Sequence, residues 1–305
     1  MKISVVSPVY GAEKIIPELV RRIKSVLEKI TQEYEIVLIE DGSPDKSWEA
    51  IELACKKHTE VIGIKLSRNF GQHYAITAGI EKSTGDVIVL MDCDLQDDPK
   101  SIASLIEQYK KGFDIVFTKR AMRKHSLFKK VSAALFNSLF RYLGNKDFDV
   151  DAGTLVLFSK SVRTAFLSIN DADRLYLQLL KWVGFNKTFV TVPHNDRFEG
   201  ESSYSFSRLL NVALQGYTSF SNKLLHITII LGTIIALASF FAILVIVVMY
   251  FYNGFQSGWA SLITAIFFST GLILLNMGVV GLYVGKIFNQ TKNRPLYIIE
   301  RSLNL

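Results

Sequence analysis

The stretch GDVIVLMDCDLQDDP, residues 85–99, decides how this chain is interpreted. Its apolar run VIVLM is typical of a buried strand, and the run stops on two aspartates, Asp92 and Asp94, that are one residue apart. Ligands of a parallel α/β sheet bind at the carboxyl ends of its strands. Carboxylate and amide oxygens suit Mg²⁺ or Mn²⁺, so Asp92, Asp94 and Gln96 are candidate metal ligands. A solvated acidic turn is the alternative interpretation.

Strand and helix patterns alternate on both sides of this stretch. The patterns predict strands at 2–7, 34–39, 61–66, 87–91 and 114–118, and helices at 15–30, 47–55, 74–82 and 99–110. Such alternation indicates βαβ units and a mainly parallel, Rossmann-like sheet. Three of the predicted strands end in polar loops, at 8–13, 40–45 and 92–98. These loops should meet at one edge of the sheet and form a crevice for a nucleotide.

The polar loops also suggest how a nucleotide would be held. Asp41 can accept a hydrogen bond from a base or ribose, and Tyr10 can stack on a ring. The chain has no Gly-x-Gly-x-x-Gly fingerprint and no Walker lysine loop, which argues against a dinucleotide fold and a P-loop NTPase. Because the chain lacks a glycine-rich loop to bind phosphates, we expect a bound metal ion to neutralise the negative charge of a diphosphate.

A long apolar region dominates the last third of the 305-residue chain. Residues 224–285 contain no Asp, Glu, Lys or Arg, and a polar turn at 252–258 divides them. The two parts, 224–252 and 259–285, each exceed the ~20 residues that span a bilayer. They predict a transmembrane hairpin, with a buried helical core as the alternative.

The charges that flank the apolar region predict its orientation. Lys223 precedes the first segment, and four cations follow the second: Lys286, Lys292, Arg294 and Arg301. By the positive-inside rule both termini are cytoplasmic, as is the N-terminal domain, because residues 1–6 do not resemble a signal peptide. The net charge of +7 then favours anionic lipid head groups over nucleic acid as a partner. Two cysteines make no disulfide framework.

Basic residues follow the predicted strand 114–118 without an intervening acid: Lys119, Arg120, Arg123, Lys124, Lys129 and Lys130. Because a membrane hairpin is predicted in the same chain, these residues are interpreted as binding a lipid phosphate or the diphosphate of the donor. Arg120 is the best single candidate because it lies nearest the strand end, and Arg123 is a candidate acceptor contact. A solvated charged face is the alternative. An apolar stripe at 135–143 is either core or bilayer-facing.

Four motifs occur together in this chain: PVY at 8–10, EDGSPD at 40–45, SRNFG at 67–71 and DCDLQ at 92–96. As a set they resemble the inverting GT-A glycosyltransferases that load a sugar onto a polyprenyl phosphate, the GtrB/ArnC-like and dolichyl-phosphate mannose synthase-like enzymes. The C-terminal hairpin is similar to that of the bacterial GtrB-like branch, so the resemblance covers nearly the whole chain.

The resemblance implies roles for individual residues. Asp92, Asp94 and Gln96 would hold the metal, and four residues would line the nucleotide: Pro8, Tyr10, Glu13 and Asp41. Asp151 would orient the acceptor or act as a base, with a plain loop residue as the alternative. The chain departs from the family pattern at four places. It has Gly11-Ala12 where the family frequently has Asn-Glu, and Glu40 where Asp is usual. It also has Thr154 in place of an Asp and Val156 in place of an Arg.

The segment 197–204 resembles the family's Arg-x-x-Gly-x-Ser segment and precedes an apolar helical pattern at 206–220. That pattern predicts an interfacial helix, which would place Arg197 and Ser203 near lipid head groups. A packed core helix is the alternative.

The predicted domains are a cytoplasmic GT-A domain at 1–200, a juxtamembrane amphipathic helix at 201–223, two transmembrane helices within 224–288 and a cytoplasmic tail at 289–305. In the second transmembrane segment, glycines at 271, 278, 281 and 285 invite helix–helix association between copies, although small residues also face lipid.

The expected function is a membrane-bound hexosyltransferase. It would move sugar from a nucleotide donor, with UDP-hexose expected from the bacterial resemblance, to undecaprenyl phosphate at the cytoplasmic face of a bacterial inner membrane. Two alternatives are transfer to a growing polysaccharide and a non-catalytic membrane scaffold of the same fold. The sequence QLLKW at 178–182 is similar to a processive-synthase motif, but these enzymes usually carry more membrane spans.

Overall fold

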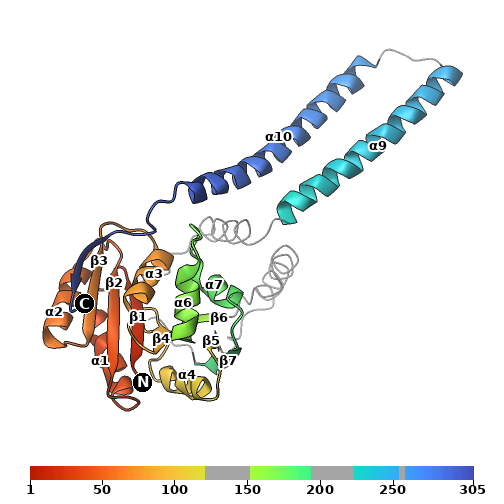
Figure 1. Cartoon of the computed structure of the whole chain (residues 1–305). Coiled ribbons are helices and arrows are strands. Elements are labelled where there is room, and N and C mark those ends of the chain that lie inside the picture. The colour runs from red at the N-terminus through yellow and green to blue at the C-terminus, as the bar shows by residue number, and fades with distance from the viewer. Residues whose placement is uncertain (121–151, 194–222, 254–257) are drawn as a thin grey trace. The chain divides into compact units, whose positions relative to one another are not determined.

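The structure is a computed structural model that describes residues 1–120, 152–193, 223–253 and 258–305 (Figure 1). The chain divides into two compact units. The first contains the sheet together with the C-terminal residues Arg294–Leu305, and the second contains the two long helices.

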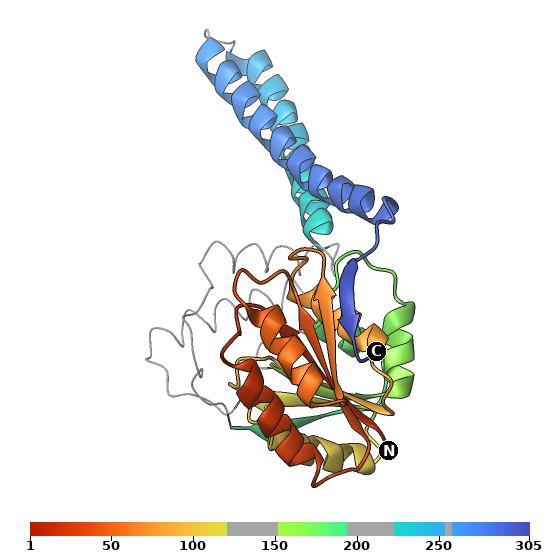
Figure 2. The ribbon, with the colours of Figure 1, turned by 90° about the vertical axis from the view of Figure 1, so that its left-hand side faces the viewer.

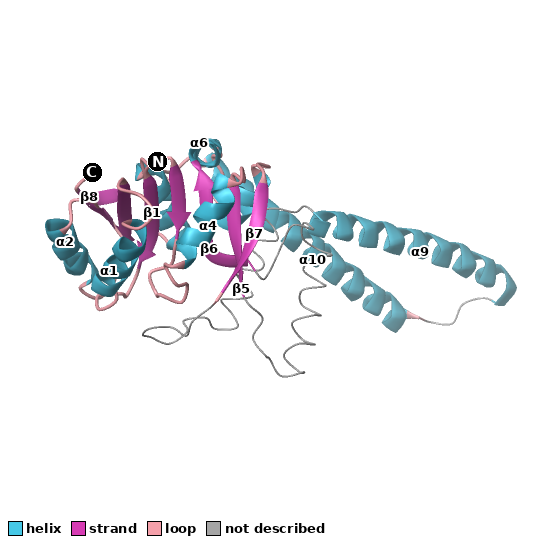
Figure 3. Cartoon of the chain, turned by 90° about the horizontal axis from the view of Figure 1, so that it is seen from below, coloured by secondary structure: helices cyan, strands magenta, loops and turns pink. Residues whose placement is uncertain are grey.

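The first unit is built on one eight-stranded sheet with the order β7-β5-β6-β4-β1-β2-β3-β8 (Figure 3). The strands are β1 Ile3–Val9, β2 Tyr34–Glu40, β3 Val61–Leu66, β4 Val87–Leu90, β5 Ile115–Arg120, β6 Ala152–Ser159, β7 Lys187–Val192 and β8 Ile299–Leu303. Of these, β6 and β8 run antiparallel to their neighbours and the other pairings are parallel. The predicted mainly parallel α/β sheet is confirmed, with the ends of the predicted strands shifted by one or two residues.

Helices cover both faces of this sheet. They are α1 Ile16–Leu27, α2 Ser47–Lys57, α3 Gln72–Lys82, α4 Ser101–Lys110, α6 Lys160–Ser168 and α7 Tyr176–Trp182. Apolar side chains of α1, α2 and α4 form one core cluster with inward-facing residues of the strands. Figure 2 shows the ribbons of α1 and α2, in red and orange, side by side on this face of the sheet. On the other face α3 comes very close to the sheet, because a Cβ on Gly79 would lie 2.4 Å from side-chain atoms of both Val6 and Ile39. Burial of these apolar faces drives the fold.

A buried carboxylate links the amino-terminal ends of β1 and β2 to the turn that precedes β4. Glu35 at the start of β2 is 4% exposed and accepts hydrogen bonds from Ser4 Oγ at 2.6 Å and from the backbone N–H of Thr84 at 2.6 Å, and it forms an ion pair with Lys2. Burial on its own would raise the pKa of Glu35, but these hydrogen bonds outweigh it and lower the pKa. The ionised form therefore stabilises the fold.

Glu35→Gln is expected to lower the apparent Tm in detergent at pH 7 by roughly 5–10 °C, because it removes the ion pair and one acceptor oxygen from a buried network. The folded-state pKa is depressed, so this contribution is present above the unfolded value of 4.5 and is lost as pH falls through the folded pKa. The gap between wild type and variant should therefore shrink as the pH falls below 4.5. Exposed Glu33→Gln is the control, and an equal Tm for both variants at pH 7 would contradict the prediction.

The C-terminal strand β8 pairs antiparallel with β3 and forms an edge of the sheet. No pattern in the sequence predicted this strand, whose residues Ile-Glu-Arg-Ser-Leu are mostly polar and exposed. The predicted cytoplasmic tail at 289–305 thus includes a strand of the first unit.

The second unit contains α9 Lys223–Asn253 and α10 Trp259–Thr291, which run antiparallel. Among the described residues, one stretch, Ala265–Thr291, is long and apolar enough to cross a membrane, and α9 contributes a shorter apolar stretch, Ile227–Phe241. A helix is present in each predicted span, but the described residues supply one membrane-length stretch rather than the predicted two. The transmembrane hairpin therefore stays a prediction.

Candidate active site

Three polar loops converge at one edge of the sheet, as the sequence predicted. Strands β4, β1 and β2 are adjacent and parallel, and Val9 at the end of β1 is directly opposite Glu40 at the end of β2. The loops that follow these strands therefore leave the sheet side by side. One of them carries Asp92 and Asp94, the second carries Asp41, and the third carries Tyr10.

The acidic loop after β4 is shaped so that its candidate ligands reach the surface. Asp92, Asp94 and Gln96 are partly exposed, whereas the alternate residues Leu95 and Asp97 are buried. Leu95 adopts a left-handed backbone with φ 58°, which is uncommon for a branched residue and frequent at functional turns. The Asp94 Oδ1 atom accepts a hydrogen bond from the backbone N–H of Gln96 at 3.1 Å. This hydrogen bond closes the turn between the two candidate ligands.

The donor set of this loop fits a hard divalent cation. Two carboxylates and one amide oxygen match the preference of Mg²⁺ or Mn²⁺ for a few protein oxygens, with substrate phosphates and water completing the shell. In the described parts of the chain, no cluster of three or more His, Cys, Asp or Glu side chains is placed to hold a metal. Burial raises the pKa of the intervening Cys93 thiol to about 12, and the Asp92 charge adds to the shift, so in the metal-free protein this thiol is protonated at neutral pH.

Gln72 is a site residue that the sequence did not single out. Its Nε2 donates to Asp92 Oδ1 at 2.8 Å, and it is the first residue of α3. The preceding Gly71 has φ 106°, a conformation open to glycine, which turns the chain from the SRNFG loop into the helix. The sequence contained one clue to this role: Gln72 is a polar residue in the first turn of a helix, and that helix follows a strand whose carboxyl end lies at the site.

Asp41 holds the neighbouring loop rather than standing open to solvent. It is 3% exposed, and its two carboxylate oxygens accept the backbone N–H groups of Phe70 at 2.8 Å and Gly71 at 2.9 Å. Burial raises the pKa of Asp41, although these two hydrogen bonds oppose the shift. The predicted contact of Asp41 with a base or ribose stays a prediction, and the structure adds a loop-organising role.

The loop after β1 is fastened to the loop after β2 by three consecutive backbone N–H groups. Those of Gly11, Ala12 and Glu13 donate to Ser43 Oγ, Ser47 Oγ and Asp45 Oδ2 at 3.0–3.2 Å. Tyr10 stays 56% exposed, which leaves its ring accessible for stacking. Pro8 is buried within β1, so it shapes the strand end.

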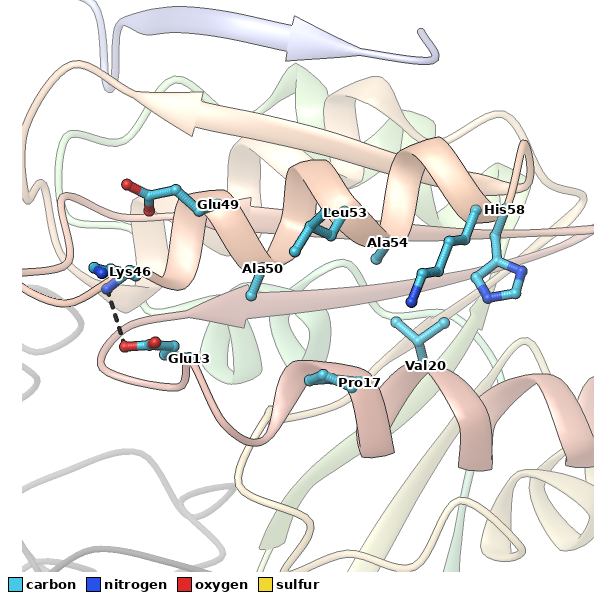
Figure 4. A pocket seen from close by; sticks show the side chains of 10 residues that line it. Glu13, Pro17, Val20, Lys46, Glu49, Ala50, Leu53, Ala54 and His58 are labelled. Atoms are coloured by element: carbon cyan, nitrogen blue, oxygen red, sulfur yellow. Dashed lines mark hydrogen bonds between the residues drawn. The ribbon is translucent and has the colours of Figure 1, made fainter.

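Glu13, in the loop after β1, also borders a groove beside the site. Its Oε2 accepts the backbone N–H of Lys46 at 3.4 Å, and its side chain lines a groove of about 470 Å³ between α1 and α2, with His58 at the other end (Figure 4). Neither Asp41 nor the acidic loop lines this groove. The groove shares Glu13 with the converging loops, and its other lining residues come from α1, α2 and the two residues that flank α2.

Strand β6 brings further residues to the acidic loop. Thr154 Oγ1 donates to the buried carboxylate of Asp97 at 3.2 Å, and the hydroxyl of Tyr176 donates to the Thr154 carbonyl at 3.4 Å. The Tyr176 ring lies 5.6 Å from that of His73, centroid to centroid. Burial lowers the pKa of His73 to about 4, so this imidazole is neutral at physiological pH. Thr154, a departure from the family pattern, thus packs against the candidate metal loop.

Buried polar atoms without a hydrogen-bond partner occur near this same edge. Within the described ranges they are Ser7 Oγ in β1, Glu40 Oε2 at the end of β2 and His73 Nδ1 at the start of α3. Such atoms are rare in folded proteins and each calls for a bound water, an ion or a functional role. Their position near the carboxyl ends of the strands supports a ligand site there.

Several predicted residues fall outside the described ranges. They are Asp151, Arg123, Arg197 and Ser203, together with the apolar stripe at 135–143 and the predicted interfacial helix at 206–220. Arg120 is the last residue of β5, where its backbone is paired with Val192 of β7. These roles stay predictions.

Comparison with known proteins identifies the family. The family model of Glycosyl transferase family 2 matches residues 4–166, more than half of the chain. The chain belongs to glycosyl transferase family 2. Its enzyme class is therefore that of a glycosyltransferase, and the family resemblance predicted from the four motifs is confirmed.

Curated relatives of this glycosyltransferase match over almost their whole length. An uncharacterized glycosyltransferase of Bacillus subtilis, YkcC, is 34% identical over 99% of this chain and 94% of its own length. The undecaprenyl-phosphate 4-deoxy-4-formamido-L-arabinose transferase of Photorhabdus laumondii is 33% identical over 98% of this chain and 94% of its own length. The long helices are thus included in the similarity, and not only the sheet.

A solved structure supports the GT-A fold of this family 2 enzyme. Glucosyl-3-phosphoglycerate synthase of Mycobacterium tuberculosis, crystallised with Mn²⁺, UDP-glucose and phosphoglyceric acid, has a TM-score of 0.51 and is 16% identical. The similarity covers 71% of this chain and 77% of that one. At this identity the likeness establishes the fold alone.

Proposed function

We propose that this glycosyltransferase transfers a hexose from a UDP-sugar to undecaprenyl phosphate, with inversion at the anomeric carbon. The observation that carries the proposal is the convergence of Asp92, Asp94, Asp41 and Tyr10 at one sheet edge, in a chain that also has a membrane-length apolar helix. Relatives named as undecaprenyl-phosphate sugar transferases, matched over nearly the full chain, support this acceptor.

The proposed reaction needs little acid–base chemistry. A phosphate oxygen of the lipid forms a bond to the anomeric carbon, while the bond from that carbon to the nucleoside diphosphate oxygen breaks. The electron pair of that bond leaves with the diphosphate, and attack from the opposite face inverts the configuration. The acceptor is already anionic, so Asp151 would chiefly orient it.

The chain's residues would hold both substrates. Tyr10 would stack on the base and Asp41, Pro8 and Glu13 would line the nucleotide. Asp92, Asp94 and Gln96 would hold Mg²⁺ or Mn²⁺, which when bound neutralises charge on the diphosphate leaving group. Arg120 would help hold the phosphates of the donor or the acceptor. Holding donor and acceptor together lowers the entropic part of the barrier.

The membrane arrangement is also part of the proposal. Helices α9 and α10 would span the inner membrane as a hairpin, with the sheet-containing unit and both termini in the cytoplasm, as the flanking cations favour. Arg123, Arg197 and Ser203 would contact the lipid phosphate at the membrane surface. The glycines of α10 would favour association between copies of the chain.

The function can be tested with the purified full-length protein in detergent. The protein is incubated with undecaprenyl phosphate, Mn²⁺ or Mg²⁺ and a panel of radiolabelled UDP- and GDP-sugars. Chelator-sensitive label in the organic phase from one donor is expected and would name the sugar. Label only in soluble oligosaccharide would instead support a polysaccharide acceptor. No transfer by folded protein would overturn the proposal and favour a scaffold.

A further inference from the structure

The segment 297–304 at the C-terminus, hereafter the C-terminal segment, is bound along strand β3. Leu66 pairs with Ile299 and Gly63 with Leu303, and the backbone N–H of Ser67 donates to the carbonyl of Ile298 at 2.9 Å. Lys65 Nζ and Glu300 add an ion pair at 3.1 Å. The C-terminal segment therefore pairs with β3 up to the point where that strand turns into the SRNFG loop.

The C-terminal segment also holds the C-terminal end of α2. Asn304 has φ 57°, and its Nδ2 donates to the carbonyls of Cys55 at 3.0 Å and Val61 at 2.9 Å. The last carbonyls of a helix have no partner within the helix, so this amide supplies one from outside. Arg301 Nη1 lies 3.3 Å from Glu52 Oε1, one turn before Cys55 in the same helix.

A third contact reaches α3. The hydroxyl of Tyr297 donates to the carboxylate of Glu81 near the end of that helix. The segment thus touches strand β3 and two helices on opposite faces of the sheet, α2 and α3, all of which are far from it in sequence. Figure 2 shows the strand, in dark blue, beside the sheet.

Each of these three elements carries part of the candidate nucleotide site. Helix α2 begins at Ser47, whose hydroxyl accepts the N–H of Ala12 in the Tyr10 loop. Strand β3 continues into the loop whose N–H groups bind Asp41. Helix α3 begins at Gln72, the partner of Asp92.

We propose that the C-terminal segment is a positioning element of the nucleotide-sugar site. It fixes α2, β3 and α3 relative to one another, and so sets the loops that carry Tyr10, Asp41 and Asp92. The inference rests on the proposed function. Release of the segment would let these loops move, and Tyr10 and Asp41 would then no longer be held in place for the nucleotide. A misplacement of about 1 Å can also cost about 100-fold in rate. Residues 292–296 join this segment to α10 along the chain.

The test measures nucleotide affinity in the full-length chain. UDP and GDP, each with Mn²⁺, are titrated calorimetrically into the wild type and into the double variant Arg301→Ala/Asn304→Gly. Glycine at 304 keeps the left-handed backbone and removes only the amide. The Kd of the bound nucleotide is expected to rise about tenfold at a temperature where the thermal transition shows the variant to be folded. A purely structural role would lower Tm and leave Kd unchanged.

Arg294→Ala is the matched control, because this arginine is exposed in the same C-terminal region and lies outside the C-terminal segment. Its Kd should equal that of the wild type. If the double variant does not fold, the single variants carry the same comparison, each with a smaller rise in Kd. A wild-type Kd in the folded variants would overturn this inference alone. Failure of the wild type to bind either nucleotide would overturn the proposed function, and this inference with it.

Discussion

Asp94→Ala is expected to lower kcat/KM for sugar transfer at least about 10³-fold, equivalent to roughly 4 kcal/mol of transition-state stabilisation. Asp94 is one of the partly exposed carboxylates of the acidic loop, and its Oδ1 atom also accepts the Gln96 N–H that shapes the turn. Alanine removes both a candidate metal ligand and the turn's acceptor. The measurement is organic-phase label under saturating Mn²⁺, with the donor identified in the panel assay.

The control for this variant lies in the same loop. Asp98 Oδ1 accepts the backbone N–H of Lys100 at 3.0 Å just before α4. Asp98→Asn keeps this acceptor and removes one negative charge, so its activity should stay within about twofold of wild type, because a surface substitution of this kind changes energies by only ~0.5 kcal/mol. Asp94→Ala with more than a tenth of wild-type activity would rule out Asp94 as an essential ligand.

Gly42→Ala is expected to be the most destabilising single-methyl change in the site. Gly42 has φ 62°, and a Cβ there would lie 2.3 Å from Asn69 N and 2.6 Å from Arg68 C, which are backbone atoms that cannot rotate away. The left-handed conformation costs about 1–2 kcal/mol and the overlap about 1–3 kcal/mol more. The SRNFG loop would be pushed off Asp41. The apparent Tm should fall by roughly 10 °C, and nucleotide affinity should fall with it.

Gly11→Ala separates backbone strain from steric overlap. Gly11 has nearly the same φ, 63°, but a Cβ added there would meet no atom within 4 Å. Only the conformational cost of about 1–2 kcal/mol should appear, with a fall in Tm of roughly 3–6 °C. Equal Tm values for the two variants would show that the loops at 40–45 and 67–71 do not pack against each other as described.

The sequence predicted the half of the sheet that carries the donor site. Apolar runs at β1, β2, β3 and β4 are long enough to be recognised as strands, and alternation with helices is sufficient to make them parallel. The convergence of the three polar loops followed from that topology. The location of Asp92 and Asp94 at the site could be predicted because they directly follow a buried strand. The four motifs together were specific enough to indicate the family.

The contacts within the site were not predictable in the same way. Gln72 meets Asp92 because α3 starts at the same sheet edge, and Thr154 meets Asp97 because β6 inserts antiparallel between β4 and β5. These pairings join residues that are far apart in the sequence. A polar side chain in a loop carries no local signal of its distant partner.

The sequence by itself determined the strand and helix pattern, the acidic loop and the long apolar helices, because each depends on the local order of apolar and polar residues. The tertiary structure alone decided that Asp41 binds two backbone N–H groups and that β8 completes the sheet. The physical reason is that an edge strand is half solvated, so its residues need no apolar pattern. Its place is fixed by the unpaired hydrogen-bonding edge of β3 and by the carbonyls at the end of α2.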